Sequence, residues 1–277
     1  MLVNSHIILQ KAYKENYAVG AYNINSLECA KYILEACNND KSPVIISVTE
    51  SMVNYFGGYK VISSYIKALI VDLNIKIPVA LHLDYAKSIE SCMKAIDSGF
   101  TSVMVDVSDK NIEENIEMTS AVVEYARKNN VTVEAKIESL DGMKLSDPLE
   151  CAEFVSQTNI DILSPSFGNK CNGYVKKDTL DFRLLGEISK NCKLPLTLDG
   201  AYGLDDNKIK TAIFCGVNKV NINMDIQVSW SNEIRKYLRK NRKVNDPIKI
   251  ISLAEESIKR IIHNKNELLG SKNKAFN

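Results

Sequence analysis

The feature that most limits how this 277-residue chain can fold is a series of eight short apolar segments. They span residues 18–22, 43–48, 78–83, 101–107, 131–137, 160–164, 194–198 and 219–222. The segments are continuously apolar rather than alternating, which is typical of parallel strands buried on both faces. Helical periodicity lies between them, for example over residues 27–38, 88–98, 112–128, 181–191 and 205–215.

Eight strand–helix units in one chain predict a (β/α)8 barrel, or TIM barrel, in which eight parallel strands alternate with helices. An open, doubly wound sheet is the alternative, but it gives no reason for eight units. No Pro/Gly/Ser-rich linker or shift in composition divides the sequence. We therefore expect a single domain over residues 1–277. An amphipathic stretch over residues 248–262 predicts an extra helix at the C-terminal end.

The composition argues against two classes of partner and favours one compartment. With a formal net charge of +1, the chain has no electrostatic attraction for nucleic acid or for an anionic membrane. No apolar run approaches the length that spans a bilayer. The seven cysteines are scattered and form no C-x-x-C pair, as is usual for reduced thiols. We expect a cytoplasmic protein that binds neither nucleic acid nor membrane.

Several strands are predicted to end in polar residues that would share one face of the barrel. In such barrels the carboxyl ends of the strands and the loops after them build the active site. Like charges can share a cavity only when a cation or protons neutralise them. Each carboxylate alone could cap a helix, but four together predict a site. The four are Asp84, Asp106, Glu134 and Asp199, and the other polar residues there are Asn23, Thr49, Tyr85, Lys136, Asn221 and Asn223.

Local motifs in order along the whole chain carry a family resemblance. They include A-Y-N-I-N at 21–25, S-P-V-I-I at 42–46, V-A-L-H-L-D at 79–84, G-V-N-K-V-N-I-N at 216–223 and E-L-L-G-S at 267–271. In these motifs the chain resembles the class II, metal-dependent fructose- and tagatose-bisphosphate aldolases. The resemblance implies a (β/α)8 fold, a lyase that cleaves a carbon–carbon bond, a sugar or sugar phosphate as partner, and a homo-oligomer.

The same resemblance shows that the family's metal site is altered. Family members hold a divalent metal such as zinc with three histidines, and the metal polarises the substrate ketone. At those positions this chain has Tyr85, Cys171 and Asp199. The chain contains only three histidines, His6, His82 and His263, at other places. A three-histidine site is therefore impossible, and we expect no metal cofactor.

Further differences concern catalysis and phosphate binding. Lys136 stands where the family has a carboxylate that faces the metal. The segment 139–146 is too short for the family's mobile loop with its acid/base glutamate. The resemblance retains Asp84 as the proton-transferring aspartate. At the family's phosphate site the chain keeps Gly200, Asn221 and Asn223. The serine and threonine hydroxyls that bind phosphate in the family are missing, because the neighbouring positions hold Ala201, Tyr202 and Met224.

Three hypotheses follow. In the first, the protein is a metal-free lyase acting on a ketose or ketose phosphate, with Lys136 replacing the metal charge or forming a Schiff base. Asp84 and Tyr85 would then move protons. Nearby carboxylates would raise the pKa of Lys136, which weakens it as a nucleophile, and a lysine that only neutralises them remains an alternative.

The second hypothesis keeps a metal in a changed site made of Cys171, Asp199, Glu134 and Asp106, since sulfur and oxygen ligands both bind zinc. Lys136 argues against this because it would repel the ion. In the third, the barrel is not catalytic and binds a sugar phosphate or a protein partner. The new pair of opposite charges, Lys136 and Asp199, favours a repurposed pocket. We therefore expect a lyase that acts without zinc.

Overall fold

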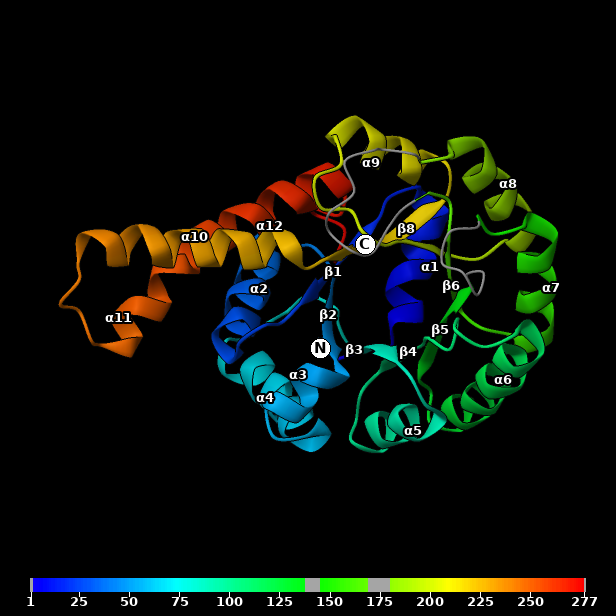
Figure 1. Ribbon diagram of the computed structural model, residues 1–277, viewed down its shortest axis with the longest axis horizontal. Coiled ribbons are helices and arrows are strands. Elements are labelled where there is room, and N and C mark those ends of the chain that lie inside the picture. Colours follow the sequence, from blue (N-terminus) through cyan, green and yellow to red (C-terminus); the bar gives the residue numbers. More distant parts are fainter. Residues whose placement is uncertain (1, 138–144, 169–179, 277) are drawn as a thin grey trace.

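The computed structural model describes residues 2–137, 145–168 and 180–276. Eight parallel strands close into a barrel in sequence order (Figure 1). They are β1 (Val19–Asn23), β2 (Val44–Thr49), β3 (Val79–Ala86), β4 (Ser102–Val105), β5 (Thr132–Ile137), β6 (Ile162–Pro165), β7 (Leu196–Leu198) and β8 (Val217–Ile222). Each strand overlaps one of the eight apolar segments, so the predicted TIM barrel is confirmed.

Helices surround the barrel, and most lie between successive strands. They are α1 (Ser5–Glu15), α2 (Leu27–Asn39), α3 (Glu50–Tyr55), α4 (Tyr59–Asp72), α5 (Ile89–Asp97), α6 (Ile112–Lys128), α7 (Pro148–Thr158), α8 (Phe182–Cys192), α9 (Asp206–Phe214), α10 (Met224–Lys240), α11 (Pro247–Ile251) and α12 (Glu255–Leu269). None of the helices in the described parts of the chain combines the length and apolar character needed to cross a membrane.

Polar caps fix where several of these helices begin. The side chains of Ser26, Ser88, Asn111 and Asp181 each accept a hydrogen bond from the backbone N–H three residues further on. Each cap satisfies a donor that the first turn of a helix leaves without an internal partner. Ser26, Ser88 and Asn111 follow closely after the ends of β1, β3 and β4, so the loops before these three helices are short.

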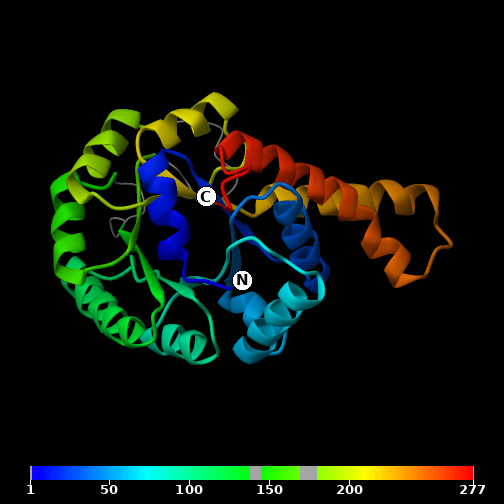
Figure 2. The same cartoon turned by 180° about the vertical axis from the view of Figure 1, so that it is seen from behind.

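Helix α1 covers the opposite, amino-terminal end of the barrel. Its residues Ile8, Leu9 and Ala12 are buried in a cluster with β1, β2, β3 and β6 residues, among them Val19 and Ile45. Figure 2 views the molecule from this side and shows α1 lying across the barrel. Since this end is covered, the barrel opens at the carboxyl ends of its strands.

The additional C-terminal helix is present, but its bounds differ from the predicted 248–262. Asp246 accepts hydrogen bonds from the backbone N–H groups of Ile248 and Lys249, so that α11 begins at Pro247. A 3-10 turn over Ser252–Ala254 then separates α11 from α12. Together with the long helix α10, which the sequence analysis did not anticipate, α11 and the start of α12 extend away from the barrel as an arm (Figure 1), and α12 then runs back to pack against α2.

Candidate active site

The carboxyl ends of the strands surround a cavity of about 710 Å³. Among the described residues its lining consists of Asn23, Thr49, Asp84, Tyr85, Lys87, Asp106, Lys136, Asp199, Gly200, Ala201, Tyr202, Asn221, Asn223, Met224, Asp225 and Gln227. The predicted catalytic and substrate-binding residues are therefore brought together here, with one exception. Glu134 lies fully buried inside the barrel. Cys171 lies outside the described residues.

A buried ion pair lies inside the barrel at the level of Glu134. Lys219 on β8 places Nζ 2.8 Å from Oε2 of Glu134 on β5, and both side chains are fully buried. Thr197 on β7 donates a hydrogen bond of 2.9 Å to Oε1 of the same carboxylate. Lys219 thus supplies positive charge to Glu134 and Asp84 inside the barrel, in addition to Lys136, which acts on Asp106 at the cavity. The sequence signal for a buried lysine was the position of Lys219 within the segment that forms β8.

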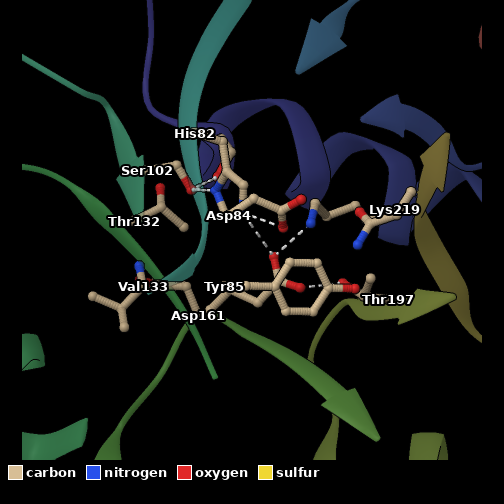
Figure 3. A network of polar contacts seen from close by, with 12 residues as sticks. His82, Asp84, Tyr85, Ser102, Thr132, Val133, Asp161, Thr197 and Lys219 are labelled. Carbon is tan, nitrogen blue, oxygen red and sulfur yellow. Dashed lines mark hydrogen bonds and ion pairs between the residues drawn. The ribbon is translucent and has the colours of Figure 1, made fainter. Parts of the chain in front are cut away.

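His82 on β3 lies beside this pair and is bonded to Ser102 on β4 (Figure 3). Its Nε2 lies 3.6 Å from Oε2 of Glu134, and its Nδ1 is hydrogen-bonded to Oγ of Ser102 at 2.8 Å. Ser102 in turn accepts a hydrogen bond of 2.9 Å from Ser5 on α1. Burial and the charge of Lys219 hold the pKa of His82 well below its usual value. The imidazole is therefore neutral.

Asp84 lies where this interior meets the cavity. It is buried, and Nδ2 of Asn23 donates a hydrogen bond of 2.8 Å to its Oδ2. Burial raises the pKa of Asp84 to about 7, although Lys219 and Asn23 act in the opposite direction and the Asp199 and Glu134 carboxylates add to the rise. A carboxyl group with this pKa can both accept and donate a proton near neutral pH.

Tyr85 and Asp199 occupy two of the positions that the resemblance assigns to metal-binding histidines, and they bind each other. The Tyr85 hydroxyl donates a hydrogen bond to Oδ2 of Asp199. The other oxygen, Oδ1, accepts from Gly200 N at 3.1 Å and from Asn221 Nδ2 at 3.2 Å. Tyr85 has a φ of +54°, and the β3–β4 register shifts between Leu83 and Ala86. Such irregularities turn a side chain in a new direction.

Two lysines line the same cavity. Lys87 binds Oδ2 of Asp106 at 2.7 Å, and Ser108 donates to Oδ1 at 2.7 Å. Burial tends to raise the pKa of Asp106, but these two bonds and the charge of Lys136 hold it below its usual value. Lys136 Nζ lies 6.0 Å from the centre of the Tyr85 ring. Tyr85 thus stands between Lys136 and Asp199, the two charges that the sequence analysis paired.

Other predicted residues have local roles or lie at the rim. The Thr49 hydroxyl caps α3 by accepting from Met52 N, and Tyr202 is 41% exposed. Asn223 accepts a hydrogen bond of 3.0 Å from Asn25, which accepts one of 2.9 Å from Gln227. The sequence analysis missed Asn25 and Gln227, along with Lys87 and Lys219. The first three follow strand ends or begin a helix, where polar residues are common and carry no distinctive signal.

The described donors do not fit the zinc site that the resemblance implies. No three histidine, cysteine, aspartate or glutamate side chains within residues 2–137, 145–168 and 180–276 are grouped so that they could hold a metal ion. The alternative ligands are engaged elsewhere: Glu134 with Lys219, Asp106 with Lys87, and Asp199 with Tyr85. A divalent ion would have to displace these partners.

Comparisons with known proteins agree with the motifs. The family model "Fructose-bisphosphate aldolase class-II" matches residues 3–274. A fructose-bisphosphate aldolase of Geobacillus stearothermophilus is 40% identical over 283 residues, covering 99% of each chain. The 6-phospho-5-dehydro-2-deoxy-D-gluconate aldolase of Bacillus subtilis is 38% identical, over 97% of this chain and 95% of its own. The crystal structure of the YdjI aldolase of Escherichia coli K12 matches with a TM-score of 0.90, 28% identity and full coverage of both chains.

The buried ion pair makes a testable contribution to stability. Replacing Lys219 with Met leaves the Glu134 carboxylate buried without its partner, and we expect a loss of about 3–5 kcal/mol in the free energy of unfolding. The double variant Lys219→Met/Glu134→Gln should recover most of this loss. Urea unfolding measures both. Lys210→Met, at an exposed position on α9, serves as control and should change stability by less than about 0.5 kcal/mol. If the single and double variants lost the same free energy of unfolding, the loss would not come from an unpaired Glu134 carboxylate, and this account of the ion pair would be wrong.

Proposed function

This chain belongs to the class II fructose-bisphosphate aldolase family, and we propose that it is a lyase that cleaves a ketose or ketose phosphate without a zinc ion. The observation that carries the proposal is the position of Asp84, Tyr85 and Lys136 along one cavity, with Tyr85 bonded to Asp199. These residues can provide the proton transfers and the positive charge that the reaction needs.

Cleavage of a ketose requires a base and an electron sink. The base removes the proton of the C4 hydroxyl, the C3–C4 bond breaks, and its electrons move onto the C2 carbonyl. An aldehyde and an enolate result, and protonation of the enolate at C3 gives the ketone product. A group that stabilises the developing oxyanion lowers the barrier of the first step.

In this proposal Asp84 is the base. It lies at the floor of the cavity, its Oδ2 is held by Asn23, and its pKa of about 7 lets it exchange protons near neutral pH. The buried Lys219 keeps the carboxylate form accessible, because it opposes the effect of burial.

Lys136 supplies the positive charge in this proposal. Lys136 acts as a positive charge on the neighbouring Asp106 carboxylate, so we assign it a role as a cation beside the C2 oxygen rather than as a Schiff base. The Tyr85 hydroxyl, oriented by Asp199, gives a proton to C3, and the proton taken up by Asp84 is returned to Tyr85 through solvent, which restores both groups. The residues that hold the substrate in this proposal are Asn23, Thr49, Asp106, Asp199, Gly200, Tyr202, Asn221 and Asn223. Glu134 acts on the substrate only indirectly, through its ion pair with Lys219 beneath the cavity.

We extend the proposal to the protein's setting. The whole chain, 1–277, acts as one domain in the cytoplasm, where its cysteines stay reduced, on a small-molecule substrate and not on nucleic acid or membrane. Self-association is supported by the arm, since α11 has no buried residue and Ile248 is 79% exposed. Light scattering tests the homo-oligomer, which a monomeric mass would refute.

Lys136→Met should lower kcat by about 10²–10³-fold if its charge stabilises the oxyanion. The measurement is a coupled assay of aldehyde release from a panel of ketoses and ketose phosphates. Lys110→Met, an exposed lysine after β4, is the matched control and should keep full activity. Borohydride treatment with an active ketose should leave Lys136 unmodified. A mass increase at Lys136 would replace the ammonium role by a Schiff base, and ligand binding without any turnover would favour a non-catalytic barrel.

The pH dependence should report Asp84. A base must be ionised to act, so kcat/KM should fall as the pH drops below about 7 and level off above it, following the raised pKa of Asp84. Asp84→Asn should remove this limb and lower kcat/KM by at least about 10²-fold. An acidic limb near pH 4, the ordinary range for an aspartate, would contradict the assignment.

A further inference from the structure

The cavity has two chemically different sides. Its two lysines, Lys87 and Lys136, come from the ends of β3 and β5. The side formed by β1, β8 and the start of α10 is lined instead by carboxamides, those of Asn23, Asn221, Asn223 and Gln227. Among the described lining residues, no lysine or arginine belongs to this carboxamide side.

Asn221 carries an acceptor on this side to which no described residue donates a hydrogen bond. Its Nδ2 donates to Oδ1 of Asp199 at 3.2 Å. Because a carboxylate only accepts hydrogen bonds, this bond fixes which end of the amide is nitrogen. Asn221 is 8% exposed, and its Oδ1 has no hydrogen-bond partner within the described residues. A buried acceptor of this kind is costly unless a donor reaches it.

A second acceptor of the same kind lies on the cavity floor. Oδ1 of Asp84 is buried and also without a hydrogen-bond partner in the described chain, since His82 Nε2 at 3.9 Å is too distant. These two oxygens, Oδ1 of Asn221 and Oδ1 of Asp84, would be satisfied by a ligand that donates hydrogen bonds. A hydroxyl group donates, whereas a phosphate dianion offers only acceptors.

This side also offers a phosphate no positive charge from its described lining residues. Gly200 N–H, a backbone donor at the edge, is already bonded to the Asp199 carboxylate. Asp225, in the first turn of α10, has its charge balanced by Lys265 at 3.0 Å. A phosphate carries a charge of about −1.5 to −2 at neutral pH, and strong phosphate sites offer cationic or unengaged backbone donors. The carboxamide side offers paired charges and side-chain carboxamides that are bonded to one another.

We propose that the carboxamide side binds an unphosphorylated, hydroxyl-bearing end of the substrate, with Asn221 Oδ1 accepting from a substrate hydroxyl. The substrate class is then a ketose with at least one end free of phosphate, not a ketose bisphosphate. This inference rests on the proposed function for its place in a reaction, but binding tests it separately.

The experiment compares fructose, fructose 1-phosphate, fructose 6-phosphate and fructose 1,6-bisphosphate by calorimetric binding and by turnover. The bisphosphate should bind at least about tenfold more weakly than the best of the other three, because one of its phosphates must meet the carboxamide side. Gln227→Lys adds a cation at an exposed position there and should move the ratio toward the bisphosphate about tenfold. Gln157→Lys, exposed on α7, adds the same charge elsewhere and should leave the ratio unchanged.

The outcomes separate the two proposals. Tightest binding of the bisphosphate by the unmodified protein, or no binding of any of the four, overturns the inference. Preferred cleavage of the bisphosphate overturns it as well while supporting the lyase function. The expected order of binding with no turnover supports the inference and refutes the lyase.

Discussion

The rest of the site depends on the ion pair between Lys219 and Glu134 in the barrel interior. Two fully buried charges persist only when each compensates the other. This pair connects β5 with β8, reaches β7 through Thr197, and lies beside His82 of β3. The Lys219 charge also opposes the effect of burial on Asp84, whose pKa is raised to about 7. The charged residues buried beneath the cavity therefore influence the protonation of Asp84 at its floor.

At the cavity, above the buried ion pair, the residues differ from those that the family resemblance implies. Two positions expected to hold a metal are instead joined by the Tyr85–Asp199 hydrogen bond, and Lys136 faces the Tyr85 ring. An ammonium ion can stabilise a developing oxyanion as a metal can, but with a single charge and a longer reach. The carboxamide side differs too, since Asn221 Oδ1 has no hydrogen-bond donor there among the described residues. Both changes leave the barrel intact, which agrees with the rule that function lies in the site rather than in the fold.

The sequence predicted the barrel well because strands buried on both faces must be continuously apolar, and turns must separate them. The strand ends also placed Asp84, Tyr85, Lys136 and Asp199 at one face. The bounds of the last helix could not be predicted in the same way, since the cap at Asp246 and the 3-10 turn interrupt an unbroken amphipathic pattern.

Individual contacts were harder to predict than positions. Lys219 was taken as the edge residue of an apolar segment, whereas β8 begins at Val217 and buries this lysine completely. The Tyr85–Asp199 bond depends on a left-handed residue and a shifted register in β3, which no local pattern encodes.

The most direct test of the central claim is turnover and metal content measured on one purified sample, before and after a chelator. A lyase working without a metal predicts less than stoichiometric metal and unchanged turnover. One zinc per chain, with activity lost on chelation and restored by zinc, would contradict it.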